Sequence, residues 1–126
     1  MVQATTLLQD TSHDPARLVA KAVVNAGVAL GLSQAEVAQI IGVSPSQISK
    51  FKTGSATLGD KPYELALYMI RVFRSLDAIT GGDTETNRAW MRNANTDLRG
   101  CPADIAKSVA GLVSVMNYLD AQRAPL

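Results

Sequence analysis

The chain of 126 residues has few of the side chains that carry out chemistry in proteins. It contains one cysteine, Cys101, and one histidine, His13. A single cysteine excludes an internal disulfide framework and leaves too few soft ligands for a zinc site. Cys101 has no histidine beside it to lower its pKa for nucleophilic attack. We therefore expect no catalytic residue, no metal and no cofactor, and we do not expect an enzyme.

The sequence also lacks an excess of one charge and a long apolar run. Twelve Lys and Arg residues balance eleven Asp and Glu residues, for a net charge of +1, so total charge predicts neither a nucleic-acid partner nor an anionic membrane. No segment approaches the roughly 20 apolar residues that span a bilayer, and the N-terminal residues do not resemble a signal peptide. We expect a soluble, cytoplasmic protein without a membrane partner.

What the chain does have is helical patterning. Hydrophobic residues make up 47% of the sequence, and they recur at helical spacing, while no stretch alternates with period two for long enough to predict a sheet. We predict an all-α fold of about seven helices. Residues 1–13 are polar and predict a flexible lead-in. The pattern of residues 14–58 predicts a helix-turn-helix bundle, and that of residues 59–126 predicts a second, small helical domain.

The stretch LSQAEVAQIIGVSPSQISKFKTG (32–54) has the spacing of a helix-turn-helix. Ser33 and Glu36 form a capping box at the start of one helix, Gly42 ends it, and Ser44 followed by Pro45 starts the next. An ordinary helical hairpin in a bundle core has similar spacing. Charge favours DNA binding, because residues 37–59 include no acidic side chain.

The second helix of such a motif offers its outward side chains to base edges, while nearby polar groups and cations contact phosphates. The residues predicted to reach base edges are Ser46, Gln47 and Lys50, and those predicted to contact phosphates are Gln34, Ser44, Ser49 and Lys52. One copy carries few cations and neutralises few phosphates. We therefore expect a homodimer with two motifs on half-sites about 34 Å apart.

This stretch resembles the Xre or phage-repressor type of helix-turn-helix, from its Ser-Gln opening to its closing Thr-Gly. It departs from that type at Pro45, where such repressors often place a polar residue that reads a base. The resemblance implies that this segment binds DNA.

The stretch FRSLDAITGGDTETNRAWMRNANTDLRGCPADIAKSVAGLVSVMNYLDAQRA (73–124) resembles the toxin-binding domain of the Xre/MbcA/ParS antitoxins. The resemblance rests on the order of an Arg-Ala-Trp-Met helix end, a polar link, Gly-Cys-Pro, and a last amphipathic helix after a glycine. It implies an antitoxin of a RES-domain toxin, a protein that consumes NAD or modifies a target with it. Neutralisation would occur by occlusion of the toxin's active site, and the helix-turn-helix would repress the antitoxin's own operon.

The second domain also contains candidate partner-binding residues. Trp90 is the only tryptophan, and it could anchor an interface or pack between helices of the core. The last helix has an apolar face that could bind a partner or be buried within its own subunit. The candidate toxin-binding residues are Trp90, Arg92, Asn117, Asp120, Arg123 and Leu126.

Two other functions remain open at this point. One is a free-standing transcriptional repressor with a self-associating C-terminal domain. The other is an interaction protein whose helix-turn-helix no longer reads DNA.

Overall fold

The computed structural model describes residues 14–123, and this part of the chain contains seven helices and no strand. The all-α prediction is confirmed. The predicted lead-in, with His13, and the predicted toxin-binding residue Leu126 lie outside the described residues. The helices are α2 (Pro15–Ala29), α3 (Gln34–Ile41), α4 (Pro45–Thr53), α5 (Asp60–Thr80), α6 (Thr84–Arg92), α7 (Pro102–Ile105) and α8 (Val109–Arg123).

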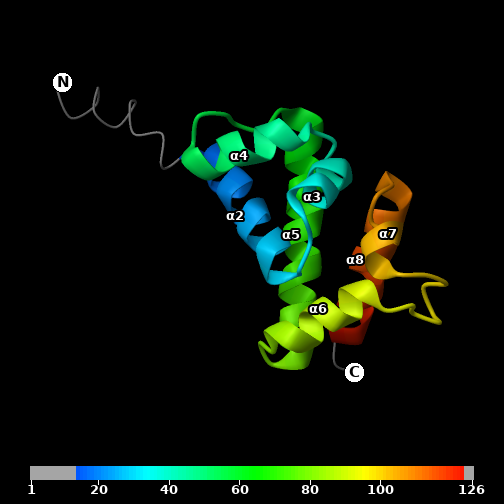
Figure 1. Ribbon diagram of the computed structural model, residues 1–126. Helices are drawn as coiled ribbons and strands as arrows, with labels where there is room; N and C mark the ends of the chain where they lie inside the picture. The colour runs from blue at the N-terminus through cyan, green and yellow to red at the C-terminus, as the bar shows by residue number, and fades with distance from the viewer. Residues whose placement is uncertain (1–13, 124–126) are drawn as a thin grey trace, which may run out of the picture.

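Helix α5 is the longest and lies at the centre of the molecule (Figure 1). Helices α2 and α3 pack against it on one side, α8 packs along it on another, and α6 crosses near its C-terminal end. A single continuous cluster of buried apolar side chains extends through all of these helices. From α5 it includes Leu65, Ala66, Met69, Val72 and Leu76.

The helix boundaries follow the capping signals in the sequence. The Ser33 hydroxyl accepts a hydrogen bond from the Glu36 N–H at 3.1 Å, and a Glu36 carboxylate oxygen accepts one from the Ser33 N–H at 2.9 Å. This reciprocal pair is the predicted capping box. Gly42 ends α3 with φ 78°, a left-handed conformation that glycine adopts without a steric cost.

Residues 93–100 form a compact turn between α6 and α7. Asn95 and Gly100 exchange two backbone hydrogen bonds of 2.8 and 3.2 Å, and the Asn95 side chain accepts a third from the Leu98 N–H at 3.0 Å. Arg99 closes the turn with φ 62°. Helix α6 therefore ends at Arg92, directly before this turn.

Buried polar side chains join α5 to α6. Asn87 is only 1% exposed. Its side-chain oxygen accepts a hydrogen bond from the Thr80 hydroxyl at 2.6 Å, and its amide nitrogen donates to the Asp77 carboxylate at 2.8 Å. These bonds satisfy a polar group that would otherwise be costly to bury, and they hold α6 across the end of α5.

Candidate functional site

The predicted helix-turn-helix is formed by α3 and α4. Ile41 of α3 and the α4 residues Ile48 and Phe51 are each at most 1% exposed, so their packing sets the angle between the two helices. In the turn, the N–H groups of Gly42 and Val43 both donate to the Ala38 carbonyl at 2.9 Å. The motif is therefore a fixed unit that presents the outer side of α4 to solvent.

The structure places most of the predicted DNA-binding side chains on the surface. Gln47 is half-buried, and its side-chain oxygen accepts a hydrogen bond from the Ser44 N–H at 3.1 Å, so it caps its own helix. The Ser44 and Ser46 hydroxyls lie 3.1 Å apart. The contact of each side chain with DNA stays a prediction. The exposed members of the set are Gln34, Ser44, Ser46, Ser49, Lys50 and Lys52.

The electrostatics of this surface favour an anionic partner. Lys50 and Lys52 are exposed in the last turn of α4, and neither α2 nor α4 contains an acidic residue. The one carboxylate of α3, Glu36, is paired with cations of the second half of the chain. A phosphate backbone could therefore approach α4 without meeting an unpaired carboxylate on these helices.

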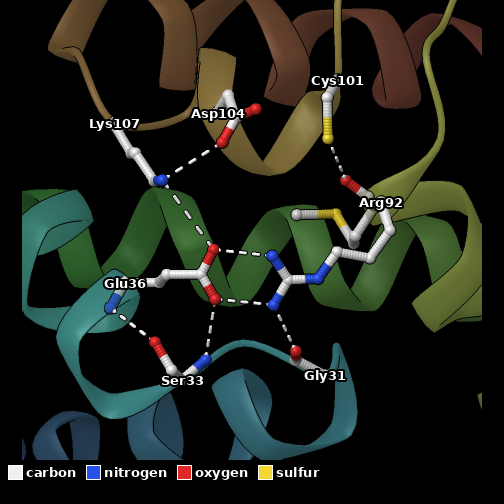
Figure 2. Close-up of polar contacts among 8 residues, drawn as sticks. Gly31, Ser33, Glu36, Arg92, Cys101, Asp104 and Lys107 are labelled. Atoms are coloured by element: carbon white, nitrogen blue, oxygen red, sulfur yellow. Dashed lines mark hydrogen bonds and ion pairs between the residues drawn. The ribbon is translucent and has the colours of Figure 1, made fainter.

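Glu36 is the centre of a polar cluster that joins α3 to α6 and to the residues after α7 (Figure 2). The Arg92 guanidinium donates to both of its carboxylate oxygens, at 2.6 and 2.7 Å, and also donates to the Gly31 carbonyl at 2.7 Å. Lys107 Nζ lies 3.8 Å from Glu36 and 3.1 Å from Asp104. We call these five residues the Glu36 cluster.

A guanidinium that donates to both oxygens of one carboxylate makes the strong form of this interaction. The bonds from Arg92, together with the Ser33 N–H and the charge of Lys107, lower the pKa of Glu36 from its ordinary 4.5 to about 2. The same pairing raises the pKa of Arg92. Glu36 therefore stays ionised at every pH near neutrality, and the cluster is held by full charges.

A second arginine of α6 binds the end of α2. The Arg88 guanidinium donates to the Val28 and Ala29 carbonyls at 3.0 and 3.3 Å. Carbonyls of a last helical turn have no partner within the helix, so a cation there satisfies them and complements the helix dipole. Arg88 and Arg92 thus fasten α6 to the helix-turn-helix half of the molecule. Spacing along α6 could not predict these long-range partners.

Trp90 is half-buried and forms part of an aromatic pair. Its ring stacks on that of Tyr118 in α8, with centroids 6.3 Å apart and an interplanar angle of 18°. The Tyr118 hydroxyl donates to the Asp97 carboxylate at 2.9 Å, which raises the pKa of Tyr118. Trp90 therefore packs α6 against α8 while part of the residue stays exposed, and its contact with a toxin stays a prediction. The sequence carries no local signal that marks Tyr118 as the partner of Trp90.

The other predicted toxin-binding residues differ in their availability. Asp120 accepts a hydrogen bond from the buried Ser75 hydroxyl at 2.9 Å and pairs with Arg71 at 2.8 Å. Arg123 is exposed and donates to Ser75 at 3.4 Å. Asn117 is exposed on α8. Arg92 belongs to the Glu36 cluster. Contact with a toxin stays a prediction for each of them.

Within residues 14–123, no three or more His, Cys, Asp or Glu side chains gather closely enough to hold a metal ion. None of the helices described is long and apolar enough to cross a membrane. The Cys101 thiol is free and donates to the Met91 carbonyl at 3.1 Å.

Comparison with known families assigns both halves of the chain. The family model described as the antitoxin Xre-like helix-turn-helix domain matches residues 11–71. The model described as the antitoxin Xre/MbcA/ParS C-terminal toxin-binding domain matches residues 75–124. The search of curated proteins finds no match to the chain. With the helix-turn-helix geometry of α3 and α4, the two matches show that the chain belongs to the Xre/MbcA/ParS antitoxin family, with a DNA-binding domain followed by a toxin-binding domain.

Proposed function

We propose that this antitoxin neutralises a RES-domain toxin, which consumes NAD or uses it to ADP-ribosylate a target, by covering the toxin's active site. The observation that carries the proposal is the pairing of an Xre-like helix-turn-helix with this toxin-binding domain on one chain. The chain acts in the cytoplasm by binding alone, without catalysis or a cofactor of its own. The exposed side chains of α8, Asn117 and Arg123, are the ones we expect to meet the toxin.

Co-expression with the protein encoded in the adjacent reading frame tests the toxin partnership. The two proteins should purify as a stoichiometric complex, and the antitoxin should stop the loss of NAD that the toxin causes in cells. Purification of this chain alone would contradict the proposal and favour a free-standing repressor.

A substitution on α8 tests where the toxin binds. Asn117→Arg adds a long charged side chain at an exposed position, so it should weaken toxin binding at least tenfold while the helical content of the antitoxin stays unchanged. Ala78→Arg, at an exposed position of α5, is the matched control and should bind normally. Removing residues 123–126 should also weaken neutralisation. Normal protection of cells by Asn117→Arg and by the protein without residues 123–126 would contradict an interface at the end of α8.

We further propose that the protein is a homodimer that represses its own operon through α4. Lys50 is exposed on α4 in a region without acidic residues. Lys50→Glu should therefore abolish the mobility shift of the operon's promoter DNA, because a carboxylate would face the phosphates. Arg99→Glu makes the same charge change in the turn between α6 and α7, and it should leave the shift intact. Light scattering tests the homodimer and should give the mass of two chains. A wild-type protein that shifts no promoter DNA would contradict repression of the operon.

A further inference from the structure

A small polar pocket lies between α2 and α4, beside the second helix of the helix-turn-helix. Its volume is about 160 Å³, and it is lined by Lys21, Val24 and Asn25 of α2 and by Lys52 of α4. Lys21 and Asn25 are four residues apart and so lie on one side of α2. Of these four residues, only Lys52 is among the DNA-binding residues predicted from the sequence.

The charge of the pocket is unbalanced. Lys21 and Lys52 are both exposed and face the same space. Helices α2 and α4, which form its walls, contain no acidic residue, and the carboxylate at the start of α2, Asp14, lies beside Arg17. Two ammonium groups around one pocket repel each other, so an anion bound between them would relieve that repulsion.

The donors of the pocket suit a phosphate group. Two ammonium groups offer up to six N–H donors, and the side-chain NH₂ of Asn25 offers two more. Neither a charged ammonium group nor an amide NH₂ accepts a hydrogen bond. A tetrahedral phosphate has several oxygens that need donors from different directions. Lysine is a common ligand of phosphates because its charge does not require a fixed plane.

The position of the pocket points to the DNA backbone as the source of that phosphate. The Arg17 guanidinium donates to the carbonyl of Gly54, the residue that caps α4, so α2 is fastened to the end of the second helix of the motif. When such a helix lies in the major groove, the strands on either side of it bring phosphates to its flanks. Helices α2 and α4 lie side by side (Figure 1). Their side chains line the pocket, so the pocket is at one of these flanks.

We propose that this pocket binds a backbone phosphate of the DNA, with Lys21 and Lys52 supplying charge and Asn25 supplying a hydrogen bond. The proposal rests on the proposed DNA binding. It adds a helix outside the helix-turn-helix to the DNA-contacting surface, and it raises the number of cations on that surface by one. The pocket fixes the register of the protein on DNA and carries no base specificity.

The salt dependence of DNA affinity tests this site in the full-length protein. Fluorescence anisotropy would give the Kd for promoter DNA and for a shuffled sequence between about 50 and 200 mM salt. Lys21→Gln removes one phosphate contact, so the slope of log Kd against log salt concentration should fall by about 0.9. Both DNA sequences should lose affinity by the same factor. Asn25→Ala should weaken both equally with little change in slope, because it removes no charge.

The controls separate the possible outcomes. Arg99→Gln makes the same change of net charge far from α4, and it should keep the wild-type slope. If the wild type binds DNA and Lys21→Gln keeps the wild-type salt slope, the pocket does not bind a DNA phosphate. The proposed DNA-binding function would be unaffected by that result. A wild-type protein that binds neither the promoter DNA nor the shuffled sequence would overturn the DNA-binding function itself. Inorganic phosphate could instead raise the melting temperature of the wild type but not of Lys21→Gln, while the salt slope of Lys21→Gln stays at the wild-type value. That result would show a site for free phosphate and would also overturn the proposal.

Discussion

At the scale of single residues, Glu36 has two structural roles. Its carboxylate completes the capping box at the start of α3, and it accepts both hydrogen bonds from Arg92 of α6. The first role is local and depends on residues three positions apart. The second depends on a residue that is far away in the chain. Because one carboxylate serves both, the start of α3, where Gln34 stands, depends on the position of the toxin-binding half.

The low pKa of Glu36 predicts a specific pH dependence of stability. Its pKa is about 2 in the folded protein, below its ordinary 4.5, so the folded state holds fewer protons between these values. The stabilisation from Glu36 is therefore complete above about pH 4.5 and is lost as the pH falls toward about 2. Glu36→Gln should lower the free energy of unfolding by about 1–2 kcal/mol at neutral pH.

Urea denaturation of both proteins from about pH 7 to about pH 3 checks this prediction. The difference between wild type and Glu36→Gln should shrink as the pH falls. Glu64→Gln, which removes the exposed partner of Lys61, is the control and should change the free energy of unfolding by less than about 1 kcal/mol. A difference for Glu36→Gln that stayed constant with pH would show that the carboxylate charge is not what stabilises the cluster.

At the scale of secondary-structure elements, the contact between α7 and the first turn of α8 is unusually close. A Cβ atom on Gly111 would overlap the Ile105 backbone carbonyl and lie 2.8 Å from the Ser108 hydroxyl. The Ser108 hydroxyl accepts a hydrogen bond from the Gly111 N–H at 3.0 Å. The two helices can approach this closely only because residue 111 has no side chain.

Gly111→Ala should therefore destabilise the protein, although alanine is the better helix former. The new methyl group must push α7 away from α8, which we expect to cost about 2–3 kcal/mol, as in other overpacked sites. Thermal denaturation measures this loss. Ser114→Ala, at an exposed position of the same helix, should stay within about 0.5 kcal/mol of wild type. A Gly111→Ala protein as stable as wild type would show that the junction can relax.

At the scale of the whole molecule, α5 belongs to both halves. It packs against α2 and α3 of the helix-turn-helix half and against α8 and α6 of the toxin-binding half. The two family matches meet within it, because one ends at residue 71 and the other begins at residue 75. The domain boundary before residue 59 stays a prediction, and the continuous core shows that the halves share their packing.

This shared helix predicts a single unfolding transition. Trp90, the only tryptophan, reports on α6 and α8, whereas far-UV circular dichroism reports on all helices. The two signals should give the same melting temperature, because loss of either half exposes the core face of α5. In Arg92→Ala both midpoints should fall together. Separate midpoints for fluorescence and circular dichroism would show that the halves unfold independently.

Much of this protein is determined by local sequence. Helix positions follow from capping pairs such as Ser33 with Glu36 and from apolar spacing, because these depend on neighbours within a turn or two. The family follows from motifs that are continuous in the chain. The surface position of Lys50 also follows, since the opposite side of its helix is apolar.

Only the tertiary structure decided which distant side chains meet. No local sequence pattern predicts that Arg92 pairs with Glu36, that Trp90 stacks on Tyr118, or that Lys21 and Lys52 line one pocket. Helix packing brings each of these pairs together. Arg92, Asp120 and Arg123 look free in the sequence, yet they form hydrogen bonds within the chain. Local periodicity specifies the helices, but the partners of polar side chains depend on how the core closes.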